Sequence, residues 1–174
     1  VGLDDPVAGF GDDDDPDICR ELITDPRRMV LVTAHRRESW GAPMEAIGSA
    51  LATLADDRDD IVVLFPLHRN PVVRDAIEPR VAGRRNVVLT EPLAYGAFCR
   101  MMRRAEVILT DSGGVQEEAP SLGRPVLVMR ENTERPEAVD AGTARLVGTD
   151  AERVTAEVGR LLDDPDEYAS MANA

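Results

Sequence analysis

Short runs of β-branched and other apolar residues alternate along the chain with longer stretches in which apolar positions recur every three or four residues. The short runs are typical of buried strands, and the longer stretches predict amphipathic helices. We expect strands at Met29–Thr33, Ile61–Phe65, Val87–Leu89, Val107–Thr110, Val126–Met129 and Leu146–Val147. We expect helices at Asp17–Thr24, Met44–Leu54, Val72–Val81, Tyr95–Arg104, Val115–Ser121, Glu134–Ala141, Glu152–Leu162 and Glu167–Ala172.

The alternation of strand and helix over nearly all 174 residues predicts βαβ units and a parallel sheet. Because crossovers between parallel strands are right-handed, helices should cover both faces in a Rossmann-like, doubly wound α/β fold. Ligands of such sheets bind outside the carboxyl ends of the strands. The residues that directly follow the predicted strands are therefore the candidates for chemistry.

The first segment, Val1 to Pro16, is rich in glycine and aspartate and contains four consecutive aspartates, Asp12 to Asp15. Such a run is typical of a solvated linker. A calcium loop would instead need spaced ligands and a glycine turn. We expect a linker over residues 1–16 and a single domain over residues 17–174.

The amino-acid composition argues against several classes of partner and indicates a location in the cell. The formal net charge is −13 and all 20 basic residues are arginine, so neither nucleic acid nor an anionic membrane is an expected partner. Any phosphate must be held locally, by arginine or backbone groups. Cys19 and Cys99 lack metal-ligand spacing, so no metal site is expected. With no membrane-length apolar run and no secretory signal, the expected location is the cytoplasm.

Both histidines of the chain follow predicted strands. His35 and Arg36 come after the first strand, where a histidine can exchange a proton near neutral pH and an arginine can clamp phosphate oxygens. His68 comes after the second strand, before an Asn70-Pro71 helix start. A solvated loop would also explain the first group, and His68 is either a ligand contact or a partner that fixes its own loop.

The fourth strand ends in the most specific pattern, Thr110-Asp111-Ser112-Gly113-Gly114-Val115-Gln116-Glu117-Glu118. Ser112 can cap the following helix, and Gly113 and Gly114 let a bulky anion approach the backbone amides. This arrangement predicts a diphosphate site, with Glu118 one turn further on as a ribose ligand. A simple Ser-Gly-Gly turn is the competing interpretation, and Pro120 should shorten or bend the helix.

Two further groups lie at strand ends. Thr133 is expected to cap a helix that has Pro136 in its first turn, which would bring Arg135 near Ser112 for a phosphate contact. A surface ion pair of Arg135 with Glu134 or Glu137 is the alternative. After the third strand, Tyr95 and Phe98 open one helix and could form a wall for a base or pack in the core.

Residues Thr33–Gly41, Pro66–Pro71, Thr110–Pro125 and Thr133–Gly142 together resemble the non-hydrolysing UDP-N-acetylglucosamine 2-epimerases, from about Met29 to Ala172. The resemblance implies the C-terminal half of a two-domain, glycosyltransferase-B-type enzyme that binds UDP in its cleft. Three positions depart from the family pattern: Ser39-Trp40 replaces Asn-Phe, and Arg69 replaces Leu.

The family epimerises C2 of the sugar and gives UDP-N-acetylmannosamine, by elimination of UDP and its re-addition, without nicotinamide, metal or other cofactor. The resemblance assigns the diphosphate to Ser112 and Arg135, beside the amides of Gly113 and Gly114, and it assigns the ribose to Glu118 and the uracil to Phe98. His35 matches the family's active-site histidine, a candidate for acid/base catalysis or a phosphate contact. It assigns Arg36 and His68 to a second UDP-N-acetylglucosamine, an allosteric activator. It also implies a homodimer, a role in cell-surface polysaccharide synthesis, and catalytic carboxylates in an N-terminal half outside this chain.

Three functions fit these patterns. The first is the UDP-binding part of such an epimerase, which in isolation would bind UDP weakly and be inactive. The second is a stand-alone nucleotide-sugar-binding module without catalysis. The third is the donor domain of a hydrolysing epimerase or of a glycosyltransferase with another specificity. We expect the first, because Arg36-Arg37-Glu38 and His68-x-Asn70-Pro71 fit the non-hydrolysing group.

Overall fold

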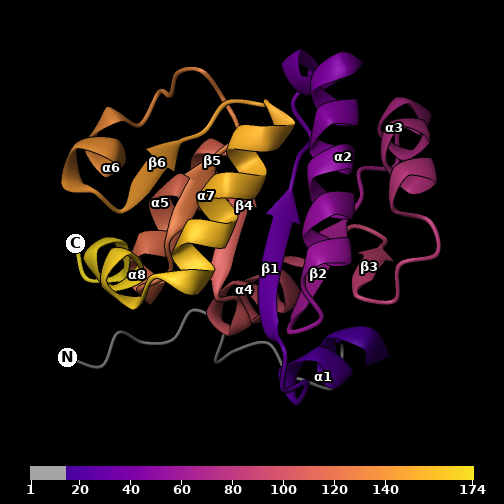
Figure 1. The fold of residues 1–174 in the computed structure, drawn as a ribbon, viewed down its shortest axis with the longest axis horizontal. Helices are drawn as coiled ribbons and strands as arrows, with labels where there is room; N and C mark the ends of the chain where they lie inside the picture. The colour runs from indigo at the N-terminus through magenta and orange to yellow at the C-terminus, as the bar shows by residue number, and fades with distance from the viewer. Residues whose placement is uncertain (1–14) are drawn as a thin grey trace.

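The computed structural model of the chain describes residues 15–174. These residues form a six-stranded parallel sheet in the order β3-β2-β1-β4-β5-β6 (Figure 1). This is the strand order of a Rossmann-like, doubly wound sheet, so the predicted fold class is confirmed. The strands are β1 (Arg28–Thr33), β2 (Ile61–Pro66), β3 (Val87–Thr90), β4 (Val107–Thr110), β5 (Val126–Val128) and β6 (Ala144–Leu146).

Helices cover both faces of this sheet. They are α1 (Asp17–Ile23), α2 (Ala42–Asp57), α3 (Pro71–Val81), α4 (Tyr95–Arg104), α5 (Gly113–Glu118), α6 (Pro136–Ala141), α7 (Ala151–Asp163) and α8 (Pro165–Ala172), with the 3-10 helices η2 (Arg37–Ser39) and η3 (Ala119–Leu122). Among the helices of residues 15–174, none is both long and apolar enough to cross a membrane.

The alternation of side chains along each strand divides the core into two clusters. Val30 and Val32 of β1 belong to the cluster formed with α2, α3 and α7. Met29 and Leu31 belong to the opposite cluster, with residues of α1, α4 and α5. Figure 1 views the sheet from the side of α2 and α7, with α4 behind it. Since both faces are buried, β1 and β2 read as nearly continuous apolar runs.

Helix starts agree with the predictions at one strand end and differ at another. Asn70 caps α3 by accepting the Val72 N–H, with Pro71 at the first helical position. The predicted cap at Thr133 is wrong, because α6 begins at Pro136 and Arg135 takes a non-helical conformation (φ −118°, ψ 62°). The physical reason is that a residue before proline is disfavoured in the helical region.

Two other element boundaries are corrected. The last strand spans Ala144–Leu146 and not Leu146–Val147, because it pairs with all of β5. The predicted helix Val115–Ser121 starts earlier, at Gly113, and its α-helical part ends at Glu118. It continues as the 3-10 helix η3, which contains Pro120 and ends at Gly123 in the left-handed conformation (φ 69°). The predicted effect of Pro120 is thus confirmed.

The end of the predicted linker is packed against the domain. Asp15 is only 5% exposed, and both of its carboxylate oxygens accept from the guanidinium of Arg100 on α4. The prediction of a solvated run is therefore wrong for Asp15, because the ion pair and its hydrogen bonds compensate for burial of the carboxylate. The remainder of the predicted linker, residues 1–14, lies outside the described residues.

Candidate functional site

The site lies at the edge of the sheet where the carboxyl ends of β1 and β4 meet. These two strands pair from Val30 and Val107 to Thr33 and Thr110, and chain connections leave them in opposite directions. The Thr33 and Thr110 hydroxyls are 2.7 Å apart and hydrogen-bonded. Such a switch point opens a crevice between the loops that follow the two strands.

Asp111 ties these two loops together. The residue is fully buried, and its carboxylate accepts hydrogen bonds from the backbone N–H groups of His35 (3.1 and 3.3 Å) and Arg36 (3.0 Å). It thereby fixes the backbone of the two residues that the sequence analysis singled out after β1. We did not assign a role to Asp111 from the sequence, because its partners lie 75 and 76 residues away along the chain.

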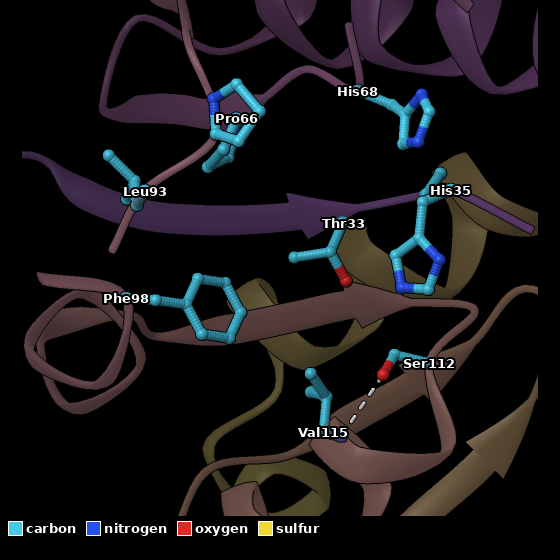
Figure 2. Close-up of a pocket in the computed structure, with 10 residues that line it drawn as sticks. Thr33, His35, Pro66, His68, Leu93, Phe98, Ser112 and Val115 are labelled. Carbon is cyan, nitrogen blue, oxygen red and sulfur yellow. Dashed lines mark hydrogen bonds between the residues drawn. The ribbon is translucent and has the colours of Figure 1, made fainter. Parts of the chain in front are cut away.

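A cavity of about 260 Å³ opens at this edge, and we call it the strand-end cavity. Figure 2 shows His35 and His68 on one side of it, with the ring of Phe98 and the side chain of Leu93 on the other. The walls are otherwise mostly apolar, as in many small-molecule sites. The residues that line it are Thr33, Ala34, His35, Pro66, His68, Pro92, Leu93, Phe98, Ser112 and Val115.

The turn Ser112–Gly114 borders the strand-end cavity. Ser112 caps α5 as predicted, because its hydroxyl accepts the Val115 N–H at 3.5 Å (Figure 2). The first amides of a helix have no partner within the helix, so Gly113 and Gly114 present donors to an incoming anion. A side chain at Gly113 would lie 3.9 Å from Nε of Arg135, which places this arginine directly beside the turn.

Arg135 pairs with neither of the two predicted surface carboxylates. Its Nε lies 3.0 Å from Glu117 Oε1 on α5, in an ion pair without hydrogen-bond geometry. That Nε–H is buried and makes no hydrogen bond to the described residues. The alternative partner Glu134 is engaged elsewhere, with Arg130 and Arg36. The Arg135 side chain as a whole is 40% exposed, so it remains accessible next to the Ser112–Gly114 turn.

Glu118 and Tyr95 face each other outside the strand-end cavity. The Tyr95 hydroxyl donates to Glu118 Oε2 at 3.3 Å, and the Tyr95 side chain is largely exposed. A hydrogen bond with Cys99 raises the pKa of Tyr95 to about 12, with a contribution from the Glu118 carboxylate. Of the two aromatic candidates on α4, only Phe98 lines the cavity.

His68 fixes its own loop, one of the two roles suggested by its position, and it lies at the strand-end cavity. It lines the strand-end cavity, and its Nδ1 accepts the Asn70 N–H at 3.1 Å, which fixes the loop. Since Nδ1 is the acceptor, the neutral ring carries its proton on Nε2. Trp40 packs near this ring, with centroids 6.2 Å apart. Arg69, which departs from the family pattern, is exposed and 3.7 Å from Glu91.

Arg36 lies beside a second cavity, of about 310 Å³, between the loops that follow β1 and β5. Its guanidinium is 3.3 Å from Glu134 and 3.4 Å from Glu38. Glu134 also accepts two hydrogen bonds from Arg130. The Arg130 and Arg36 guanidiniums hold the pKa of Glu134 far below its usual range. Arg36 and His68 thus line separate cavities.

The predicted site residues are therefore brought together in part. His35, His68, Phe98 and Ser112 line the strand-end cavity, and Gly113, Gly114 and Arg135 adjoin it at the turn. Glu118 is turned toward Tyr95, and Arg36 toward the second cavity. Within residues 15–174, no group of three or more His, Cys, Asp or Glu side chains is arranged to hold a metal ion.

The strand order, with a cavity at the switch point, defines a Rossmann-like domain of the glycosyltransferase-B type. The glycosyltransferase WaaG shares this fold, with a TM-score of 0.67 over 90% of this chain and 44% of its own. At 18% identity, that likeness concerns the fold alone.

The sequence model described as UDP-N-acetylglucosamine 2-epimerase matches residues 12–174, so the chain belongs to this family and the resemblance is confirmed. It is 54% identical to the UDP-N-acetylglucosamine 2-epimerase of Escherichia coli K12 over 88% of this chain. The matched part covers 41% of that relative, so the chain spans about two fifths of its length.

Two solved structures of relatives have a similar fold. The Neisseria meningitidis UDP-GlcNAc 2-epimerase bound to UDP-GlcNAc has a TM-score of 0.84 and 41% identity, over 90% of this chain and 44% of its own. MnaA of S. aureus, in a structure with UDP, has a TM-score of 0.87 and 40% identity, over 94% of this chain and 45% of its own.

Proposed function

We propose that the protein containing this chain interconverts UDP-N-acetylglucosamine and UDP-N-acetylmannosamine, and that this chain supplies the UDP-binding part of its active site. The observation that supports the proposal most strongly is the strand-end cavity beside the Ser112–Gly114 turn and Arg135. Family membership and relatives whose structures hold UDP-GlcNAc or UDP support the same ligand class.

Three parts of the site suit the three parts of UDP, which are the uracil, the diphosphate and the ribose. The apolar wall around Phe98 and Leu93 suits the uracil ring. The amides of Gly113 and Gly114, together with Arg135, suit the diphosphate because all are donors. Glu118 would exchange its hydrogen bond from Tyr95 for ribose hydroxyls.

In the proposed reaction, this chain stabilises the leaving group. Cleavage of the bond between sugar C1 and the UDP oxygen places negative charge on the diphosphate. Arg135 and the turn amides stabilise that charge as it develops. Because these interactions are stronger in the transition state than in the bound substrate, they lower the activation barrier. His35 lies beside Ser112 in the cavity wall, where it can contact a phosphate or transfer a proton.

The removal of the C2 proton needs a base from the other half of the protein, as in the family. We propose the family's other features for the whole protein as well: a homodimer, a cytoplasmic location, a role in cell-surface polysaccharide synthesis, and activation by a second UDP-N-acetylglucosamine. Arg36, at the second cavity, and His68, at the strand-end cavity, are the activator contacts in this proposal. The second cavity also offers the charged side chains of Glu38, Arg130 and Glu131.

The activity is tested with the whole protein and UDP-N-acetylglucosamine in deuterium oxide. We expect UDP-N-acetylmannosamine that carries deuterium at C2, because elimination and re-addition exchange that proton with solvent. Release of free N-acetylmannosamine would instead indicate a hydrolysing epimerase. Transfer of the sugar to an acceptor without inversion at C2 would indicate a glycosyltransferase.

The binding role of this chain is tested with Arg135→Ala. We expect UDP affinity to fall by about 2 kcal/mol, or about thirtyfold, because a charge-assisted contact to phosphate is lost. Isothermal titration calorimetry measures the change, with Arg153→Ala on α7 as the matched control. Unchanged UDP affinity in a folded Arg135→Ala variant would remove this residue from the site.

A further inference from the structure

A buried amide side chain connects the two halves of the proposed diphosphate site. Gln116 on α5 is only 1% exposed and does not line the strand-end cavity. Burial of an amide costs free energy unless its groups are hydrogen-bonded. Each end of this side chain has a partner, and the two partners lead to Ser112 and to Arg135.

In this series of hydrogen bonds, the donor and the acceptor of each bond are determined. Gln116 Nε2 donates to the backbone oxygen of Ser112 at 3.2 Å, and Gln116 Oε1 accepts from the Thr133 hydroxyl at 2.5 Å. The Thr133 hydroxyl oxygen in turn accepts the Arg135 backbone N–H at 2.9 Å. Because a carbonyl only accepts and a backbone N–H only donates, both the amide and the hydroxyl have one possible orientation.

This chain of bonds contributes to the position of Arg135. Arg135 precedes α6 in a non-helical conformation, and its carbonyl accepts the Ala138 N–H of that helix at 3.3 Å. The N–H of Arg135 is held by a separate bond to Thr133, and Gln116 ties Thr133 to the start of α5. The Arg135 side chain then lies beside Gly113 and 3.0 Å from Glu117. Errors of about 1 Å in such placements cost large factors in function.

We propose that Gln116 and Thr133 are positioning residues that hold Ser112 and Arg135 in the one arrangement that binds a diphosphate. The inference rests on the proposed function, since it concerns the geometry of the same UDP site. Gln116 and Thr133 act through Ser112 and Arg135. Neither touches the ligand. Their role is specific to the diphosphate, because Phe98 and Leu93 of the apolar wall make none of these bonds.

The first test compares UDP with uridine by calorimetry in Gln116→Leu, Thr133→Val and the double variant. We expect UDP affinity to fall about tenfold in each single variant, with uridine affinity unchanged. The double variant should also lose about tenfold and not about a hundredfold, since either change breaks the same chain of bonds. Thr155→Val is the control, because that hydroxyl donates to the Ala151 carbonyl within α7, away from the strand-end cavity.

The second test needs no ligand and uses hydrogen exchange of the Arg135 amide, followed by NMR. We expect faster exchange in Thr133→Val and also in Gln116→Leu, where the direct partner of the amide is intact. Gln116→Glu keeps the acceptor for Thr133 but places a carboxylate oxygen against the Ser112 carbonyl. This variant should therefore keep slow exchange at Arg135 and still weaken UDP binding.

The outcomes separate this inference from the proposed function. If the unaltered chain does not bind UDP, the binding proposal fails and the exchange experiment alone decides the inference. Equal losses of UDP and uridine affinity would show a merely structural role and overturn it. Unchanged Arg135 exchange in Gln116→Leu would overturn it as well, whatever the affinity of the chain for UDP.

Discussion

Replacement of Asp111 by asparagine is the most informative single change at the switch point. The carboxylate is fully buried and accepts the N–H groups of His35 and Arg36. Asparagine has almost the same shape, and its one acceptor oxygen can take the place of Oδ2, which accepts both N–H groups. Its NH₂ group then replaces Oδ1 and faces the His35 N–H, which bonds to Oδ1 at 3.3 Å. The change therefore removes the charge from both remaining bonds, removes the longer bond from His35, and is expected to leave the fold otherwise unaltered.

The expected loss of stability follows from these bonds. A hydrogen bond to a charged group contributes about 1.5–3 kcal/mol, so the two together set an upper limit of about 6 kcal/mol. Asparagine keeps one acceptor, and removal of a buried charge recovers part of its desolvation cost. We expect a net loss of about 2 kcal/mol in the free energy of unfolding, or about 4–8 °C in Tm for a chain of this size.

Thermal unfolding measures the first effect, and histidine NMR measures the second. The chain has two histidines, so their ring signals can be assigned by single substitutions. The His35 signals should shift in Asp111→Asn, whereas those of His68 should not. Asp140→Asn, at an exposed position on α6, is the control. A loss below about 0.5 kcal/mol, together with unmoved His35 signals, would refute the role of Asp111 as the link between the two loops.

Two helical glycines should respond oppositely to alanine. Gly159→Ala should stabilise the chain by about 0.5–1 kcal/mol, since its Cβ would meet only the flexible end of an arginine at 3.1 Å. Gly48→Ala should destabilise it, because that Cβ would lie 3.3 Å from an α3 backbone oxygen; denaturant unfolding compares the two, and the same sign for both would contradict this account. The pKa of Tyr95 is raised to about 12, mainly by Cys99 and to a smaller extent by Glu118. The contribution of Tyr95 to stability is therefore present below about pH 10 and is lost as the pH rises toward 12. Ultraviolet titration of the phenol should show a lower pKa in Glu118→Gln, and an unchanged titration would exclude the contact.

Most of the architecture could be predicted from the sequence, because buried strands and helices show regular patterns of apolar residues. β1 and β2 are buried on both faces, so their apolar runs are nearly continuous and easy to recognise. The candidate residues followed from one general property, that parallel strands end at a common edge. For this reason His35, His68 and Ser112 could be expected at one site before any contact was known.

Contacts between distant segments left no such record. Asp111 and Gln116 belong to the motif that appeared most specific, yet Asp111 bonds to the loop after β1 and Gln116 Oε1 bonds to Thr133 on the loop after β5. Asp15 belongs to a run that is typical of a solvated linker, but its partner Arg100 is 85 residues away along the chain. The partner of Arg135 proved to be Glu117, and not a neighbour in sequence. The start of α6 at Pro136 could have been predicted, because the residue before a proline, here Arg135, seldom takes the helical conformation.

The most direct test of the central claim is calorimetric titration of this chain with UDP, with uridine as the comparison ligand. The account predicts that UDP binds more tightly than uridine, and that Ser112→Ala and Glu118→Ala weaken UDP binding. Thr155→Val should leave it unchanged. Equal affinity for UDP and uridine would contradict a diphosphate site at the Ser112–Gly114 turn, and so would a folded chain that binds neither ligand.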